Sequence, residues 1–454
     1  MKNKMVRALA LVMAVMTVSM TGSVSIYASD AEAAGTAEAE EGTEISEETG
    51  AADTEAGAGQ EAADNVAALI DKIYVQERTD TTDEDCIAAK EAWDALTDDQ
   101  KALVEGENAS PDYFGLDTGD ASLDDARNAD EIGENELLVV SFGTSYNDSR
   151  VEDIKGIEDA LQEAYPDWSV RRAFTAQIII NHVQARDGEA IDNMQQAMDR
   201  AVENGVKNLV VQPTHLMHGA EYDEMMETLD AYQDQFESIA VAEPMLGEVG
   251  DDATVINEDK AAVAQAVADA AVADAGYDSM EAAAEDGAAF VFLGHGTSHT
   301  AKVSYSQMQT QMSELGYANA FIGTVEGEPE ETACEAVISA VKEAGYTKVI
   351  LRPLMVVAGD HANNDMAGSD ADSWKSMFEA DGSFESIEAQ IAGLGRIDAV
   401  KQLYVEHTGA AIDSLGAADA GDNTSDAEAA DAGGAETEDT AAETDSTGTE
   451  EIAD

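Results

Sequence analysis

The amino-acid sequence predicts an α/β protein with two similar halves, each a parallel sheet covered by helices, facing each other across a central cleft. Short apolar segments alternate with amphipathic segments at helical spacing, this pattern occurs twice, and polar loops follow the matched apolar segments. Short, fully apolar strands that alternate with helices are typical of a parallel sheet buried on both faces. A small helical module precedes the two halves, and an acidic segment lies at each end.

Seven apolar segments of the main domain are expected to be strands: 137–142, 169–175, 208–212, 238–242, 289–293, 320–325 and 349–354. Between the first two, Ile154, Ile157 and Leu161 recur at helical spacing, and Met308 and Met312 do so after the fifth. This spacing predicts helices that cover the sheets.

The two halves repeat each other at three landmarks. Residues 141–150, SFGTSYNDSR, parallel residues 293–302, LGHGTSHTAK, and residues 205–225 parallel residues 345–366. Between these matches, FTAQ of the first half corresponds to GTVE of the second. Three landmarks in the same order indicate two similar α/β halves.

Polar side chains directly follow three strands of the second half, at His295, Glu326 and His361. In open α/β sheets, ligands bind beyond the carboxyl ends of the strands, so these three side chains are expected to converge. The aligned positions of the first half carry no imidazole and are Phe142, Gln177 and Glu221.

Two neutral imidazoles and a carboxylate suit a borderline divalent ion such as Co²⁺, Ni²⁺, Fe²⁺ or Zn²⁺. The three residues lie on separate loops, so no short metal-binding motif marks them. A histidine at a strand end is also often only hydrogen-bonded to its neighbours. The residue pattern alone therefore leaves a shared metal site and local hydrogen bonding both open.

Both ends of the chain are acidic and poor in large apolar residues. The formal net charge is −72, from 95 Asp and Glu against 23 Lys and Arg. Residues 29–63 and 416–454 cannot bury enough surface to offset the entropy of ordering, which predicts disorder. The charge also makes nucleic acid and anionic membrane surfaces unfavourable partners.

Residues 1–28 have the layout of a secretory signal peptide. Basic residues precede an uncharged stretch at 8–20, and small residues near Ala28 offer a cleavage site. The apolar stretch is too short to span a bilayer comfortably. We expect an exported protein, extracellular, cell-wall associated or periplasmic, with no membrane span after cleavage; an uncleaved anchor is the alternative.

Residues 64–106 predict a small helical module with no assigned chemistry. Val66, Ile70 and Ile73 form an apolar stripe, and a capping box in TDDQ opens a further short helix. The two cysteines, Cys86 and Cys334, form no Cys-x-x-Cys motif. Two packed, unpaired thiols are expected, with one long-range disulfide left open.

A resemblance to a known family extends across nearly all of residues 137–415. The motifs LLVVSFGTSY, RAFTAQIIINH, FLGHGTSH, IGTVEGEPE and PLMVVAGDHANNDMAGSDADSWK resemble those of the anaerobic, CbiK-like sirohydrochlorin cobaltochelatases. That family is similar in fold to ferrochelatase. The resemblance implies a chelatase domain at 136–415 with Rossmann-like lobes at about 136–260 and 286–415.

The resemblance implies insertion of Co²⁺, as a substrate metal, into the reduced tetrapyrrole sirohydrochlorin, with His295, Glu326 and His361 serving the metal. Insertion must strip water from the cation and remove two pyrrole protons, for which a base that titrates near neutral pH is suited. We expect His295 to act also as proton acceptor and Glu326 as third ligand or proton relay. Asp360 is expected to orient His361. No organic cofactor is indicated, and homo-oligomer formation is left open.

Four residues of the first half are candidate substrate contacts: His215, Glu221, Ser141 and Thr144. A local structural hydrogen bond explains His215 equally well. His299 is expected to cap a helix or to be exposed, with a further metal ligand as the alternative, and His182 and His407 are expected to be surface or packing residues on helices.

Export leaves two functions open. One is a chelatase that acts outside the cytoplasm, and the other is a non-catalytic metal or tetrapyrrole binder for uptake or storage. The retained proton-handling residues favour the chelatase. An acidic protein must also accept an anionic tetrapyrrole, and five arginines could either supply positive charge or form ordinary salt bridges: Arg150, Arg171, Arg172, Arg186 and Arg352.

Overall fold

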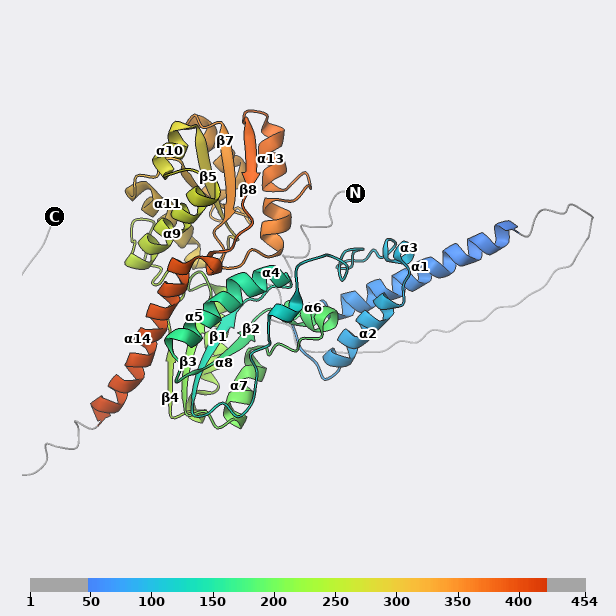
Figure 1. The fold of residues 1–454 in the computed structure, drawn as a ribbon, viewed down its shortest axis with the longest axis horizontal. Coiled ribbons are helices and arrows are strands. Elements are labelled where there is room, and N and C mark those ends of the chain that lie inside the picture. The colour runs from blue at the N-terminus through green and yellow to red at the C-terminus, as the bar shows by residue number, and fades with distance from the viewer. Residues whose placement is uncertain (1–47, 423–454) are drawn as a thin grey trace, which may run out of the picture.

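The computed structural model describes the backbone of residues 48–422 and the side chains of residues 57–415. The expected signal peptide at 1–28 and the last part of the chain, 423–454, lie outside the described residues. The described part comprises a helical module and two α/β lobes (Figure 1). In this part, no helix is both long enough and apolar enough to cross a membrane.

The first lobe is built on a four-stranded, all-parallel sheet in the order β2-β1-β3-β4. Its strands are β1 (Asn135–Ser141), β2 (Ser169–Phe174), β3 (Asn208–Pro213) and β4 (Ser238–Val241). The central strand β1 is apolar and almost entirely buried, as expected for a strand covered by helices on both faces.

The second lobe repeats this sheet with the order β6-β5-β7-β8, again all parallel. Its strands are β5 (Ala288–Gly294), β6 (Ala320–Thr324), β7 (Lys348–Pro353) and β8 (Ser386–Ala389). The equivalent strand orders confirm the predicted fold of two similar Rossmann-like halves. The short edge strand β8 was not predicted, because its four half-buried or exposed residues carry little hydrophobic pattern.

Helices cover both sheets. Those of the first lobe are α4 (Asn147–Ser149), α5 (Gly156–Ala164), α6 (Gln177–Asp187), α7 (Met194–Glu203) and α8 (Ala220–Asp230). Those of the second lobe are α9 (Glu258–Asp274), α10 (Met280–Glu285), α11 (Val303–Glu314), α12 (Cys334–Glu343) and α13 (Trp374–Asp381).

The last helix, α14 (Asp398–Asp422), leaves the second lobe and packs along the first (Figure 1). The Tyr404 hydroxyl donates to the Thr214 carbonyl at 3.1 Å, and the Thr408 hydroxyl donates to Gln212 Oε1 at 2.8 Å. The sequence assigned these residues to the second lobe, because helical periodicity does not say which sheet a helix covers. The helix also continues past residue 416, where an acidic tail was expected.

The helical module contains α1 (Glu48–Ile73), α2 (Thr82–Asp94) and α3 (Asp98–Lys101), and α2 packs against α6 of the first lobe. The expected capping box of α3 is present between Thr97 and Gln100. A disordered linker was expected up to residue 63, whereas α1 begins at Glu48 and Ala63 is fully buried. Ala and Glu are strong helix formers, so this segment continues the helix without an apolar stripe.

The two cysteines are free and buried. Cys86 lies in the module and donates to the Asn181 carbonyl of α6 at 3.5 Å, while Cys334 begins α12 of the second lobe. Burial raises the pKa of Cys86 to about 11, so its thiol is protonated at neutral pH. The thiols therefore act as packed side chains, as expected.

Candidate metal site

Two imidazoles from separate loops meet at the carboxyl edge of the second sheet. His295 directly follows β5, and His361 lies on the loop after β7, ahead of the single-turn helix η7 (Ala362–Met366). The ring centroids are 4.6 Å apart and the ring planes are inclined by 75°. The structure thus brings together the two histidines that the sequence singled out.

Tyr305 of α11 packs against the loop that carries His295 and hydrogen-bonds its backbone. The Gly296 amide donates to the Tyr305 hydroxyl at 3.1 Å, and a Cβ added at Gly294 would lie 2.2 Å from the Tyr305 ring. Gly296 itself has a φ of +91°, which favours glycine. The G-H-G sequence therefore fixes the backbone under His295. Tyr305 carried no signal in the sequence.

His295 is set up as a neutral imidazole with one free ring nitrogen. Its Nδ1 lies 2.7 Å from the Gly296 carbonyl, which can only accept, so Nδ1 carries the proton and Nε2 keeps its lone pair. Burial lowers the pKa of His295, and the neighbouring His361 lowers it further, against smaller opposing effects of Glu326 and Glu221. This histidine is therefore ready to bind a metal or accept a proton at neutral pH.

His361 has the opposite shift. Burial acts to lower its pKa, but the hydrogen bond and charge of Asp365, with smaller contributions from Asp360 and Glu326, raise it overall. The His361 Nδ1 lies 2.6 Å from Asp365 Oδ2, so Nδ1–H donates and Nε2 faces the other way. A carboxylate on the far nitrogen orients a ligating imidazole and increases its basicity.

The orienting carboxylate is Asp365 rather than the expected Asp360. Asp360 instead accepts a hydrogen bond from Asn364 Nδ2 at 2.7 Å. Because the chain turns into helix at η7, a residue four positions after His361 lies beside it. The Asp360 carboxylate lies near the same imidazole, but its hydrogen bond is to Asn364. The i, i+4 spacing of His361 and Asp365 was the signal that the sequence offered.

Glu326 follows β6, and its backbone is tied to the His295 loop. Its amide donates to the His295 carbonyl at 2.9 Å, and a Cβ on Gly296 would lie 2.9 Å from the Glu326 Cβ. Its carboxylate is exposed. Within the part of the chain whose side chains are described, the group of ligand atoms lying within 4.8 Å of one another is Asp360, His361 and Asp365; His295, Glu326 and His361 are not packed that tightly.

Two candidate residues of the first lobe, His215 and Glu221, interact electrostatically, and Glu221 also acts on His295 of the imidazole pair. His215 has both ring nitrogens buried and without a hydrogen-bond partner, and burial lowers its pKa to about 4 against an opposing effect of Glu221. Glu221, exposed at the start of α8, also acts on the pKa of His295. A local hydrogen bond, the alternative explanation for His215, is thus not what holds its ring.

Ser141 and Thr144 have structural contacts instead. Ser141 is 1% exposed and shares a 2.7 Å hydrogen bond with Thr214, so its hydroxyl lies inside the first lobe. Thr144 is 4% exposed, and its Oγ1 would lie 3.0 Å from a Cβ at Gly359. Ser141 ends β1, and Thr144 belongs to the G-T-S loop that follows it and lies next to Gly359 of the other lobe. Packing therefore explains both residues without a substrate contact.

The remaining histidines lie where they pack or cap. His299 accepts from the Ala301 amide and pairs with Asp223 of the first lobe at 3.3 Å. His182 stacks on Tyr113 of the module and is buried, which lowers its pKa to about 3. The other two contact the same residue: His218 pairs with the Glu243 carboxylate at 3.1 Å, and His407 lies 3.0 Å from the Glu243 carbonyl.

The five candidate arginines already have protein partners, so the salt-bridge alternative describes most of them. Arg172 is fully buried between Glu158 and Asp124. The others bond as follows: Arg150 to Asp124, Arg186 to Asp187, Arg352 to Asp274, and Arg171 to the Ala129 carbonyl. Each of the five guanidinium groups is therefore already bound by the protein and is not reserved for an anionic ligand.

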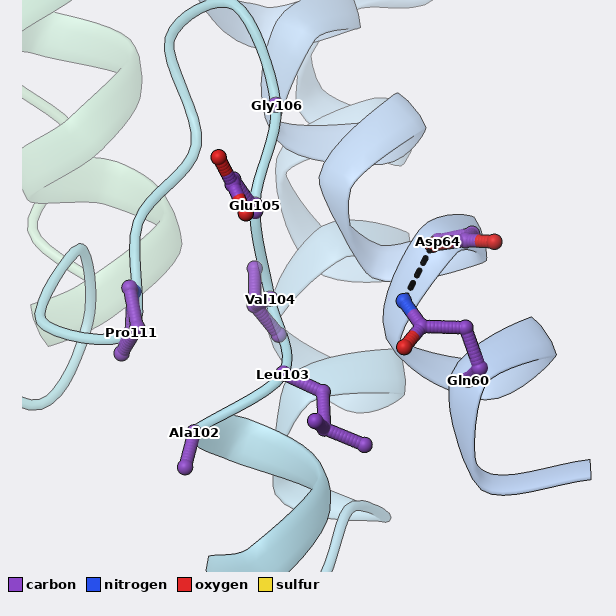
Figure 2. A pocket seen from close by; sticks show the side chains of 8 residues that line it. All are labelled: Gln60, Asp64, Ala102, Leu103, Val104, Glu105, Gly106 and Pro111. Atoms are coloured by element: carbon purple, nitrogen blue, oxygen red, sulfur yellow. Dashed lines mark hydrogen bonds between the residues drawn. The ribbon is translucent and has the colours of Figure 1, made fainter. Parts of the chain in front are cut away.

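A pocket of about 480 Å³ lies elsewhere, between α1 and the loop after α3 (Figure 2). Its lining includes Gln60 and Asp64, joined by a 2.8 Å hydrogen bond, and Pro111, and it contains no histidine. All its residues belong to the N-terminal part of the chain, away from both sheets. It is not a candidate for the chemistry at the imidazoles.

The carboxyl edges of the two sheets meet around the imidazole pair. Ser149 Oγ of the first lobe donates to the Ala358 carbonyl at 2.7 Å, and Asp153 Oδ2 accepts from the Ala358 amide at 3.0 Å. The His361 loop is therefore fixed by both lobes. Fold and candidate site together define the class: a two-lobed α/β metal chelatase.

Comparison with known sequences gives the family. The profile described as "Cobalt chelatase (CbiK)" matches residues 135–413, and the chain belongs to that family. It is 33% identical over 271 residues to the sirohydrochlorin cobaltochelatase of Salmonella typhimurium, covering 60% of this chain and 94% of that protein. It is 27% identical over 281 residues to the sirohydrochlorin cobaltochelatase CbiKC of Nitratidesulfovibrio vulgaris, covering 62% and 91%.

Among solved structures, SirB from Bacillus subtilis with Fe³⁺ matches with a TM-score of 0.43 and 15% identity, over 63% of this chain and 98% of that one. The family match confirms the resemblance noted in the motifs. It leaves the helical module, α1 to α3, outside the matched region.

Proposed function

We propose that this protein inserts Co²⁺ into sirohydrochlorin or a closely related tetrapyrrole. The observation that carries the proposal is the pair of imidazoles with centroids 4.6 Å apart, each with its Nδ1 hydrogen committed to a carbonyl or carboxylate and its Nε2 free. Family membership supports the reaction, because both curated relatives described above are named as sirohydrochlorin cobaltochelatases.

The metal is a substrate in this reaction and must be held weakly enough to be released. Two imidazoles offer nitrogen ligands that suit Co²⁺. Glu326 supplies a third ligand by rotating its exposed side chain, since its backbone is already fixed beside His295. With few protein ligands, the ion keeps open positions that the macrocycle nitrogens can fill.

Insertion replaces two pyrrole N–H protons with one Co²⁺, so two protons must leave for each metal inserted. The lowered pKa of His295 keeps this imidazole neutral, as a ligand and proton acceptor must be. His215, whose pKa of about 4 also keeps it neutral, lies on the first lobe with Glu221 beside it. We assign the second proton to the His215 and Glu221 pair, through the exposed carboxylate of Glu221.

Export, expected from residues 1–28, stays a proposal, and so does a carrier role in place of catalysis. The proton-accepting groups around the imidazoles support catalysis, because a carrier does not need them.

The experiment is to mix the mature protein with Co²⁺ and sirohydrochlorin and to follow the absorption change of metal insertion. Wild type should turn over many equivalents, and His295→Ala should lose at least about 100-fold in kcat, the scale of removing a proton acceptor. Tight binding of tetrapyrrole or Co²⁺ without turnover in wild type would instead establish the carrier.

A further inference from the structure

The connection between the first two helices of the module lies on the first lobe. Gln76 Oε1 accepts from the Gln177 amide, the first residue of α6, at 3.1 Å. Asn181 Nδ2, one turn further along α6, donates to the Ile73 carbonyl at 2.8 Å. Because α6 begins just after the carboxyl end of β2, residues 74–76 lie at the carboxyl edge of the first sheet (Figure 1). This edge meets the loop of His361 through Ser149 and Asp153.

This edge carries exposed apolar side chains. Tyr74, Val75 and Phe142 are 36%, 39% and 46% exposed. Phe142 is adjacent to the start of α6, since its carbonyl accepts from the Ala176 amide at 3.2 Å. In the internal repeat, Phe142 occupies the position of His295 and Gln177 that of Glu326. The first lobe thus presents an apolar surface where the second presents metal ligands.

The charge of Asp360, next to His361, acts on Tyr74. Together with burial it raises the pKa of the Tyr74 phenol, so this side chain is a neutral hydrogen-bond donor. The same carboxylate acts on Tyr146 of the first lobe: burial and the charge of Asp360 raise its pKa to about 12, against an opposing effect of Asn364. The charge of Asp360 thus acts on two protonated phenols, one from the module and one from the first lobe.

We propose that the helical module completes the substrate site, with residues 74–76 forming one wall and Tyr74 contacting the tetrapyrrole. This rests on the proposed function and deepens it, by assigning part of substrate recognition to a segment outside the region matched by the family. Val75 and Phe142 offer apolar surface to the face of the macrocycle, and the Tyr74 hydroxyl donates to one of its carboxylates. A neutral donor suits this role because the candidate arginines already have protein partners.

The test uses the full mature chain with three substitutions: Tyr74→Ala, Tyr74→Phe and, as a matched control, Ile87→Ala. Ile87 is an apolar residue of the same module, on α2, and is 57% exposed. For each variant, KM for sirohydrochlorin and kcat are measured at saturating Co²⁺. Tetrapyrrole affinity without metal is measured by fluorescence quenching.

Tyr74→Phe, which loses only the hydroxyl, should raise KM and the tetrapyrrole Kd about tenfold, the scale of one lost hydrogen bond to a charged group, with kcat within about twofold of wild type. Tyr74→Ala should give at least as large a rise because it also loses the ring, and Ile87→Ala none. Wild-type KM and Kd in Tyr74→Ala would overturn this inference while leaving the chelatase intact. If wild type neither binds nor metallates the tetrapyrrole, the proposed function fails, and this inference fails with it.

Discussion

Asp365 sets the protonation of His361. Its carboxylate lies 2.6 Å from the His361 Nδ1 and outweighs burial, so the pKa of His361 is raised above its usual value near 6.5. Co²⁺ must displace a proton from this imidazole, and metal affinity should therefore fall as the pH drops through that raised pKa.

Asp365→Asn removes this charge and should lower the pKa of His361. The acid limb of Co²⁺ binding should then move to lower pH by about one unit. At high pH, where proton competition is absent, affinity should fall about tenfold because the ligand is less basic and less well oriented. Calorimetric titration of Co²⁺ between pH 5 and pH 9 measures both effects.

Asp360→Asn is the matched control, because Asp360 hydrogen-bonds Asn364 rather than the imidazole. Its shift in the pH midpoint should be the smaller of the two. An unchanged midpoint in Asp365→Asn would show that His361 does not limit metal binding.

The residue scale also shows what the sequence could predict. His295 and His361 were predictable because each follows a buried strand, and parallel strands end at one edge. The environment of His215 was not, because local sequence patterns do not reveal that both its ring nitrogens are buried without a hydrogen-bond partner. Thr144 recurs in the second half as Thr297 and packs against Gly359, a packing role that a repeat alone does not separate from a chemical one.

Among the elements, β1 contains a buried carboxyl group. Glu136 is 2% exposed, and burial raises its pKa from 4.5 to about 8, against weaker opposing effects of Arg171 and Arg200. Between these two pH values the folded state keeps a proton that the unfolded chain has lost. Folding stability should therefore decrease as the pH rises from about 4.5 to about 8, and remain level above that.

Glu136→Gln removes this penalty. Because one pKa unit corresponds to about 1.36 kcal/mol and the pKa of Glu136 rises from 4.5 to about 8, the variant should be more stable than wild type by roughly 5 kcal/mol at pH 9, with little difference at pH 4. Urea unfolding at both pH values tests this, with Glu134→Gln as a control at a carboxylate whose side chain is 66% exposed. Equal stabilities of Glu136→Gln and wild type at pH 9 would mean that ionising Glu136 in the folded state costs no free energy, which would contradict this account.

Element prediction succeeded where an element is buried on both faces. The seven predicted strands, all rich in Val, Ile, Leu or Phe, are present, whereas the edge strand β8 was missed. Helix α14 was recognised as part of the domain but assigned to the wrong lobe. Its contacts with β3 and β4 depend on a crossing between lobes that local patterns do not encode.

For the whole molecule, one carboxylate ties the two lobes together behind the His361 loop. Asp153 is fully buried on the first lobe, accepts from the Ala358 amide, and pairs with Arg396 Nε at 2.7 Å. Ala358 lies three residues before His361. The position of a metal ligand on one lobe therefore depends on a side chain of the other.

Asp153→Ala leaves the Ala358 amide without its acceptor and Arg396 without its buried partner. Unfolding free energy should fall by about 3 kcal/mol, and metal affinity should fall as well because the His361 loop loosens. Asp398→Ala is the control: this side chain is 98% exposed, and its pair with Lys401 should contribute less than about 1 kcal/mol. Losing stability with unchanged Co²⁺ affinity would separate the lobe contact from the metal site.

At this scale the sequence predicted the parts better than their arrangement. The helical module was recognisable from Val66, Ile70 and Ile73, but its docking on α6 through Asn181 and Cys86 was not. Such docking joins two surfaces that are far apart in the chain, and local sequence patterns do not predict it. The contribution that we propose for Tyr74 could therefore be inferred only from the structure.

The most direct test of the account is the ligand shell of Co²⁺ bound to the full mature protein, measured by X-ray absorption at the cobalt edge. The account predicts two imidazole nitrogens with oxygen ligands, and the loss of one imidazole in His295→Ala and in His361→Ala. A shell made of oxygen alone, or one that neither substitution changes, would contradict it.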